Sequence, residues 1–135
     1  MGRQEEDNIA VVKTFYEYLG RGDRDGAYAS VIAEDCVLYE ADSLPYGGVY
    51  HGRETMKDVL RGVIARFDDF EFEIRNYLAG GDEVVVHLHL KGVGRQSRKS
   101  FSIPTMELWR VRDGRVVELR PFLYDAAALS EALAA

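Results

Sequence analysis

Apolar residues recur along the chain with two different periods, and the change of period separates a helical first half from a strand-rich second half. Between residues 56 and 67 the apolar side chains follow the i, i+3, i+4, i+7 rule, which is typical of an amphipathic helix. The same spacing over residues 9–19 predicts an earlier helix that Asp7 or Asn8 caps and that Gly20 ends. A helical first half therefore precedes the point at which the period changes.

Beyond Phe67 the period falls to two, as expected for strands with one buried face. In the first of these strands Phe70, Phe72, Ile74 and Leu78 are expected on the same face, with Tyr77 on the other. Further strands are predicted, with hairpin turns between them, over residues 83–93, 101–112 and 115–124.

The remaining elements complete a single α+β domain over residues 1–135. They are a short helix from Asp25, a strand over Cys36–Ala41, turn chemistry over residues 42–48, and a tail helix over 126–133. Helices gathered before an antiparallel meander predict a twisted sheet wrapped around them, with a hollow that suits a small ligand.

Composition and charge exclude several classes of function. The chain has 135 residues and a net charge of −6, which argues against nucleic acid or an anionic membrane as a partner. Cys36 is the one cysteine, so an intramolecular disulfide is excluded. The polar N-terminus shows no signal peptide and no apolar run reaches the length of a membrane span, so we expect a cytoplasmic protein.

Two glutamates occupy positions that the apolar pattern marks as buried. Glu107 alternates in phase with Phe101, Ile103 and Trp109, and Glu40 ends the apolar strand that starts at Cys36. A carboxylate on an apolar strand face is costly to ionise, so such a group is paired, protonated or functional. The glutamates are therefore the first candidates for chemistry.

The order of elements and four local motifs resemble the nuclear transport factor 2-like superfamily, which includes ketosteroid isomerases and SnoaL-type polyketide cyclases. The motifs are Gly22-Asp23, Ala33-Glu-Asp-Cys36, His51-Gly-Arg-Glu54 and Asp113-Gly-Arg115. The resemblance implies a cone-shaped SnoaL-like domain, in which a curved antiparallel sheet wraps around three N-terminal helices.

The isomerase branch of the superfamily also implies site residues. By this resemblance Glu40 corresponds to the general base and Glu107 to a protonated hydrogen-bond donor. In ketosteroid isomerases an apolar site keeps the corresponding carboxyl neutral, so that it can donate a hydrogen bond. We include His51 as a proton relay. The oxyanion tyrosine falls on Phe15, and Tyr16 is expected to point about 100° away on the helix. The expected substrate-binding residues are Phe15, Tyr16, Tyr46, Leu60, Val86, Leu88, Trp109 and Leu123.

Each candidate also has a structural interpretation. Glu40 is alternatively satisfied by backbone amides or by Arg53, and Glu107 by an ion pair with Arg120 or Arg75. His87 and His89 lie on one strand face, but no third ligand accompanies them, so we expect no metal and no cofactor.

The predicted function is binding of a small hydrophobic carbonyl or phenolic compound, with cofactor-free proton transfer of isomerase, cyclase or lyase type if the protein is an enzyme. The alternative is a non-catalytic ligand-binding module, or a dimerisation or assembly domain. Apolar residues on the second sheet face, Val85, Met106, Leu108 and Phe122, predict a homodimer formed through the convex face.

Overall fold

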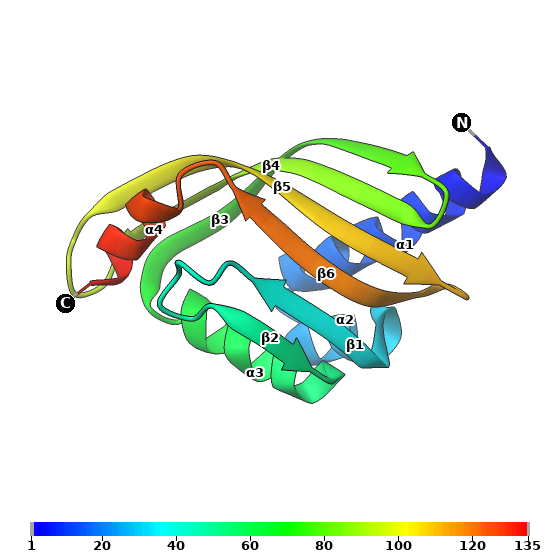
Figure 1. Ribbon diagram of the computed structural model, residues 1–135, viewed down its shortest axis with the longest axis horizontal. Coiled ribbons are helices and arrows are strands. Elements are labelled where there is room, and N and C mark those ends of the chain that lie inside the picture. The colour runs from blue at the N-terminus through cyan, green and yellow to red at the C-terminus, as the bar shows by residue number, and fades with distance from the viewer. Residues whose placement is uncertain (1, 135) are drawn as a thin grey trace.

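The computed structural model describes residues 2–134 of the chain (Figure 1). Within this range it has four helices and one six-stranded sheet. The elements in chain order are α1 (Arg3–Gly20), α2 (Arg24–Val31), β1 (Ile32–Glu40), β2 (Gly48–His51), α3 (Arg53–Ile64), β3 (Phe67–Gly80), β4 (Glu83–Gly94), β5 (Ser100–Arg112), β6 (Arg115–Leu123) and α4 (Ala126–Leu133).

The strand order across the sheet is β2-β1-β6-β5-β4-β3. The strands β3 to β6 form the antiparallel meander that the sequence predicts. β1 joins this meander by pairing in parallel with β6, with Leu38 opposite Leu119, and β2 then pairs antiparallel with β1. The sheet thus combines local hairpins with one long-range strand pairing among the described residues.

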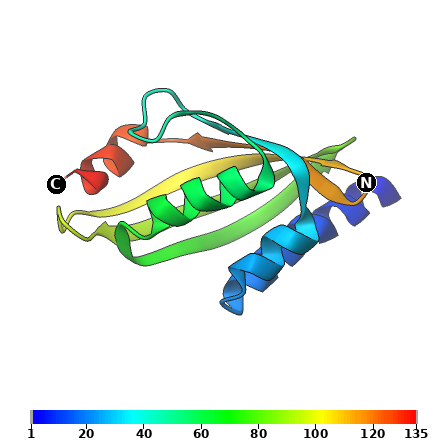
Figure 2. The same cartoon turned by 90° about the horizontal axis from the view of Figure 1, so that it is seen from below.

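The helices α1, α2 and α3 gather on one side of the curved sheet, as Figure 2 shows for the blue, cyan and green helices. The strands turn alternate residues toward these helices, and Leu38, Val86, Leu88 and Trp109 are almost completely buried there. Burial of this apolar face contributes most of the stabilisation, at roughly 25 cal/mol per Å². The core therefore lies between the helices and the concave face of the sheet.

Three local predictions were wrong, each for a physical reason. α1 begins at Arg3, before the expected caps, and the buried Asn8 side chain donates instead to the Gly81 carbonyl at 3.4 Å. β2 was not predicted because its residues follow Gly47 in a segment of turn chemistry. A register shift in β3 between Ile74 and Asn76 reverses the alternation, so Leu78 is 50% exposed and Tyr77 packs on the core.

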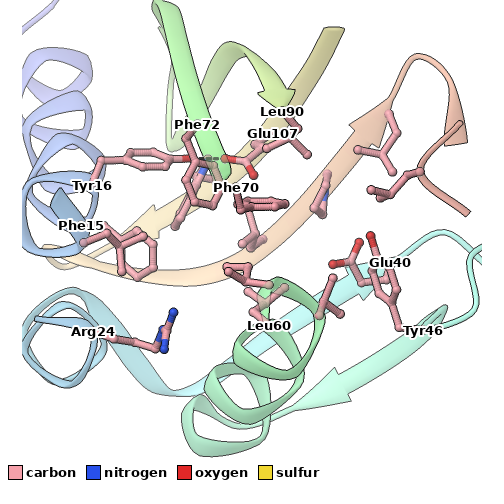
Figure 3. Close-up of a pocket in the computed structure, with 18 of the residues that line it drawn as sticks. Phe15, Tyr16, Arg24, Glu40, Tyr46, Leu60, Phe70, Phe72, Leu90 and Glu107 are labelled. Atoms are coloured by element: carbon pink, nitrogen blue, oxygen red, sulfur yellow. Dashed lines mark hydrogen bonds between the residues drawn. The ribbon is translucent and has the colours of Figure 1, made fainter. Parts of the chain in front are cut away.

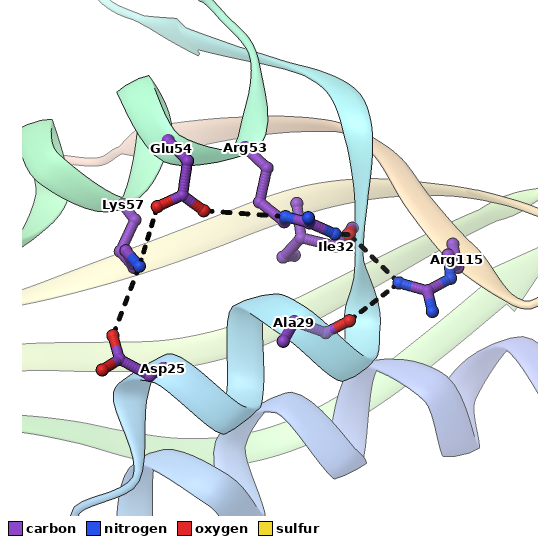
Figure 4. A network of polar contacts seen from close by, with 7 residues as sticks. All are labelled: Asp25, Ala29, Ile32, Arg53, Glu54, Lys57 and Arg115. Atoms are coloured by element: carbon purple, nitrogen blue, oxygen red, sulfur yellow. Dashed lines mark hydrogen bonds and ion pairs between the residues drawn. The ribbon is translucent and has the colours of Figure 1, made fainter.

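A polar network fixes α2 against α3 and β1 (Figure 4). Lys57 of α3 forms ion pairs with Glu54 at 2.9 Å and with Asp25 of α2 at 3.3 Å. Arg53 and Arg115 donate to the Ile32 carbonyl at 3.3 and 3.4 Å, where the chain passes from α2 into β1. These contacts determine where the first residues of α2 stand relative to α3.

The tail helix α4 closes one end of the sheet. Its last carbonyl groups accept hydrogen bonds from Arg66 (to Leu133, 2.7 Å) and from Ser97 (to Ala132, 2.8 Å). The backbone of Gly94 lies directly under Ala132, so close that a Cβ atom there would stand 1.9 Å from the Ala132 oxygen. α4 is thus held on the end of β4 by polar contacts and by a close backbone approach.

None of the helices within residues 2–134 combines the length and the apolar character that crossing a membrane requires.

Candidate active site

A cavity of about 80 Å³ lies between the helices and the concave face of the sheet (Figure 3). A single water needs roughly 10–15 Å³ of such space, so the cavity has room for several waters or a small ligand. Its lining is mostly aromatic and aliphatic, and the residues come from the helices and from every strand except β2: Phe15, Tyr16, Leu19, Arg24, Tyr28, Glu40, Tyr46, Leu60, Val63, Ile64, Phe70, Phe72, Leu90, Glu107, Trp109, Leu119, Pro121, Leu123 and Leu129.

Glu107 lies in the wall of this cavity and is 6% exposed. It stands in the middle of β5, between Val86 of β4 and Pro121 of β6. The hydroxyl of Tyr16 in α1 donates a hydrogen bond to Oε1 of its carboxyl (Figure 3). Burial raises the pKa of Glu107 to about 7, although the Tyr16 hydrogen bond acts in the opposite direction.

Tyr16 is held for this role by its surroundings. Its ring packs edge-on against Trp109, with ring centroids 5.8 Å apart, and against Phe72 at 5.6 Å. Burial and the neighbouring Glu107 raise the pKa of Tyr16 well above its usual value, so the hydroxyl stays protonated and remains a donor. One carboxyl oxygen of Glu107 is therefore fixed, and the second is left to face a ligand.

Trp109 adds a second polar group to the same wall. The side chain is 1% exposed, and its indole N–H is buried with no hydrogen-bond partner that meets normal geometry among residues 2–134. The indole nevertheless lies near enough to Glu107 to lower the pKa of that carboxyl against the larger effect of burial. The wall thus contains a donor that the described residues leave without a partner.

Glu40, at the end of β1, lines the cavity from the same concave face of the sheet, two strands away from β5, and is 7% exposed. Within residues 2–134 its carboxyl forms no hydrogen bond or ion pair, and the guanidinium of Arg53, the partner that the sequence offered, contacts Glu54 and Ile32 instead. Burial, and to a lesser degree the charge of Glu107, raise the pKa of Glu40 to about 8. Glu40 is thus a buried acid that ionises within the neutral range.

Tyr46 covers Glu40 from the loop between β1 and β2, and Figure 3 shows the two side chains together. Burial and the charge of Glu40 raise the pKa of the Tyr46 phenol. The loop itself is pinned, because the Tyr50 hydroxyl donates to the Tyr46 carbonyl at 2.7 Å and the Gly47 amide donates to the Leu44 carbonyl at 2.9 Å. Tyr46 therefore belongs to a well-defined wall.

The structure brings most of the sequence-predicted site residues into one cavity. The two carboxyls line it together with Phe15, Tyr16, Tyr46, Leu60, Trp109 and Leu123. Val86 and Leu88 are buried in the core on the same face but do not reach the cavity. His51 lies apart from these groups, exposed at the end of β2.

The alternative partners proposed for Glu107 are engaged elsewhere. Arg120 pairs with Glu118 at 3.5 Å and stacks on the Tyr39 ring at 3.9 Å. Arg75 pairs with Glu73. Glu107 therefore has a tyrosine rather than an arginine as its partner.

Sequence reasoning missed three features of this site. It named Tyr16 as a substrate-binding residue but not as the partner of Glu107, and it expected the side chain to point about 100° away from Phe15. Both side chains line the cavity, because a cavity on a curved sheet receives more than one row of side chains from α1. It gave no role to Arg24, the first residue of α2, or to Tyr28 in the middle of that helix. The available signal for Arg24 was an arginine directly after the Gly22-Asp23 motif.

Among residues 2–134, no three histidine, cysteine, aspartate or glutamate side chains are grouped as a metal site would require.

The fold resembles that of several solved structures. A nuclear transport factor 2-like protein from Burkholderia xenovorans is 24% identical with a TM-score of 0.83, and the similarity covers 98% of this chain and 100% of that one. A protein described as a SnoaL-like polyketide cyclase from a Jannaschia species is 21% identical, with a TM-score of 0.83 and coverage of 100% and 97%. TerC, crystallised with polyporic acid, is 18% identical, with a TM-score of 0.77 and coverage of 90% and 94%.

These similarities define a nuclear transport factor 2-like fold. The model of the SnoaL-like domain matches residues 12–119, and the chain therefore belongs to the SnoaL-like family. No protein of curated function matches the chain.

Proposed function

We propose that this protein binds a small apolar carbonyl or phenolic compound in the cavity and transfers a proton within it. Glu40 acts as the base and Glu107 as the hydrogen-bond donor. The observation that supports this most directly is that two buried carboxyls, which have no cationic partner among residues 2–134, line the same apolar cavity. Burying two such groups lowers the free energy of unfolding, so stability alone disfavours this arrangement, and a functional role accounts for it.

The proposed step is proton transfer at a carbon next to a carbonyl group. Ionised Glu40 removes a proton from that carbon, and the electron pair moves into the enolate that forms. Protonated Glu107 donates a hydrogen bond to the enolate oxygen through the oxygen that Tyr16 does not occupy, with the Trp109 N–H available beside it. Return of the proton to another carbon gives an isomer, and attack of the enolate on a second carbonyl gives a ring.

Two of the similar structures bear on the substrate class. One is described as a polyketide cyclase, and TerC was crystallised with a compound whose name denotes an acid. At 18–21% identity these similarities show a shared fold, so they support the choice of probes rather than a substrate.

The test is exchange of α-protons of 4-phenylcyclohexanone into deuterated water, followed by proton NMR. We expect the wild type to catalyse the exchange and Glu40→Gln to lower the rate by about 10²–10⁴-fold, the usual contribution of a general base. Glu34→Gln, a change at an exposed position of the same strand, is the matched control and is expected to keep the wild-type rate.

Thermal melting with the same compound separates binding from chemistry. Ligand at 100 times its dissociation constant adds about 2.7 kcal/mol to the free energy of unfolding. A thermal shift in both the wild type and Glu40→Gln, without exchange in either, would indicate a ligand-binding module rather than an enzyme. Neither shift nor exchange across a panel of ketones and phenols would leave the assembly domain as the better hypothesis.

A further inference from the structure

Arg24 is the cationic side chain of the cavity, and among residues 2–134 it forms no ion pair or hydrogen bond. It is the first residue of α2, and Figure 3 shows its guanidinium directed toward the space that Phe15 and Leu60 border. A guanidinium carries five donors in a planar fork and cannot lose its charge in the physiological range. A group of this kind in an apolar cavity is chemically suited to binding an anion.

The acidic neighbours of Arg24 in the sequence are already engaged. Asp23 caps α2 by accepting from the Gly26 amide at 2.9 Å. Asp25 pairs with Lys57 at 3.3 Å, and Lys57 is itself held by Glu54 at 2.9 Å (Figure 4). The network that anchors α2 to α3 thus satisfies the nearby carboxylates and leaves Arg24 free to meet a ligand.

Arg24 stands where the cavity opens to the surface. An outer groove adjoins the cavity, and six residues line both: Tyr16, Leu19, Arg24, Ile64, Phe70 and Phe72. Glu40, Tyr46 and Glu107 line the cavity but not the groove, whereas the exposed Glu71 lines the groove but not the cavity. A ligand that enters from the groove therefore passes Arg24 before it reaches the two buried carboxyls.

We infer that Arg24 binds an acidic oxygen group of the ligand, and that the compounds this site accepts are apolar molecules with a carboxylate at one end and a carbonyl at the other. The guanidinium fork matches a carboxylate in two parallel hydrogen bonds. The buried Glu40 and Glu107 disfavour a second anion in the interior, so the carboxylate stays at the mouth and the carbonyl is directed inward. This inference rests on the proposed role of the cavity as a ligand site and adds the class of ligand.

The experiment compares two probes that differ by one carboxylate, 4-(4-oxocyclohexyl)benzoate and 4-phenylcyclohexanone. Trp109 is the one tryptophan of the sequence and stands in the cavity wall, so its fluorescence reports binding of either probe. The variants are Arg24→Gln and Arg24→Lys. Arg21→Gln, at an exposed position outside the cavity lining, is the control for net charge.

We expect the wild type to bind the carboxylate probe about tenfold or more tightly than the neutral one, as a charge-assisted hydrogen bond predicts. Arg24→Gln should abolish this preference by weakening the binding of the carboxylate probe. Arg24→Lys should retain part of the preference, and Arg21→Gln all of it. Equal affinity of the wild type for both probes, or a preference that survives Arg24→Gln, would overturn the inference.

In this design the anion subsite and the proton transfer are refuted by different outcomes. An Arg24-dependent preference without α-proton exchange on either probe would refute the proton transfer and leave the anion subsite in place. Exchange that depends on Glu40 but occurs equally on both probes would refute the subsite and leave the chemistry. Absence of binding by either probe to the folded wild type would overturn both.

Discussion

At the scale of single residues, the two buried carboxyls determine how this protein responds to pH. Glu40 has a pKa of about 8 and Glu107 of about 7, both above the ordinary value for a glutamate. Because each charge raises the cost of the other, the two groups titrate as a pair and share one proton between these values. Stability and the proposed activity therefore depend on the same two groups in different ways.

Stability should fall as the pH rises from about 5 to 8. In this interval the unfolded chain has already lost the protons of both glutamates, whereas the folded chain still holds them, so folding is favoured at low pH. The stabilisation is present below the ordinary glutamate pKa and is lost as the pH passes through the raised values of about 7 and 8. For Glu40 the effect is on the order of a few kcal/mol.

The measurement is the melting temperature of the wild type and Glu40→Gln at a series of pH values. Glu40→Gln should make the fall of the melting temperature with pH less steep. The melting temperature of the variant relative to that of the wild type should therefore be higher at about pH 8 than at about pH 5. The exposed change Glu34→Gln should leave the slope as it is. A slope that is the same in all three proteins would show that Glu40 ionises normally.

Activity should instead follow a bell-shaped pH profile. Below about pH 7 both carboxyls are protonated and no base is present, and above about pH 8 both are ionised and no donor remains. Between these values the pair holds one proton, and because the pKa of Glu40 is the higher, the active form with ionised Glu40 and protonated Glu107 is the less populated of the two singly protonated forms. Tyr16→Phe removes the hydrogen bond that lowers the pKa of Glu107, so the acidic limb should move to higher pH. Tyr18→Phe, two residues further along the same helix, is the control, because the Tyr18 hydroxyl accepts a hydrogen bond from Ser30 and does not contribute to the cavity lining.

The profile is measured as the α-proton exchange rate of 4-phenylcyclohexanone against pH. An acidic limb that stays in place in Tyr16→Phe would mean that the ionisation of Glu107 does not determine that limb.

At the scale of elements, α4 acts as a cover for one end of the cavity, because Leu129 contributes to the lining. Gly94→Ala should displace this helix, since a Cβ at Gly94 would meet the Ala132 carbonyl oxygen at 1.9 Å. The cost should exceed about 1 kcal/mol, as for an alanine at a position that cannot accept it. Ligand binding should weaken as well.

Gly62→Ala provides the opposite control. Gly62 lies within α3, where a Cβ would meet nothing within 4 Å, and alanine there should stabilise the helix by roughly 0.5–1 kcal/mol. The two variants are compared by urea unfolding and by Trp109 fluorescence with a bound probe. Equal stability of Gly94→Ala and the wild type would contradict the close packing of α4.

The sequence predicted elements better than it predicted their contacts. The strong periods of α3 and the meander are local properties, so they could be read directly, and the buried positions of Glu40 and Glu107 followed from them. The strand β2 and the register shift in β3 depend on pairing partners distant in the sequence, which no local pattern encodes. The partner of Glu107 could not be predicted, because the choice between Tyr16 and an arginine is made by the curvature of the sheet.

At the scale of the whole molecule, the convex face of the sheet remains uncovered by α1, α2 and α3 (Figure 2). Met106 and Phe122 are neighbours on adjacent strands there and are 43% and 55% exposed. A second copy of the chain would cover this face by the symmetric contact that the sequence predicts. We expect a dimer in solution.

The test is the molar mass by light scattering during size-exclusion chromatography. The paired change Met106→Glu and Phe122→Asp should give a folded monomer, because two charges on each copy would oppose the contact. Val49→Asp, at an exposed apolar position on the edge strand β2, should leave the dimer intact. A monomeric wild type would contradict the expectation directly.

The parallel pairing of β1 with β6 has a consequence for the order in which the molecule folds. It joins Leu38 to Leu119, across a chain separation that encloses α3 and most of the meander. Hairpins form quickly, whereas contacts between distant segments must first overcome the entropy of closing a long loop. We expect β1 to join the sheet late in folding, and Glu40 lies at its end. The two carboxyls would then come together only after the rest of the sheet has formed. An incompletely folded chain would hold Glu107 beside Tyr16 while Glu40, the proposed base, still lies outside the sheet.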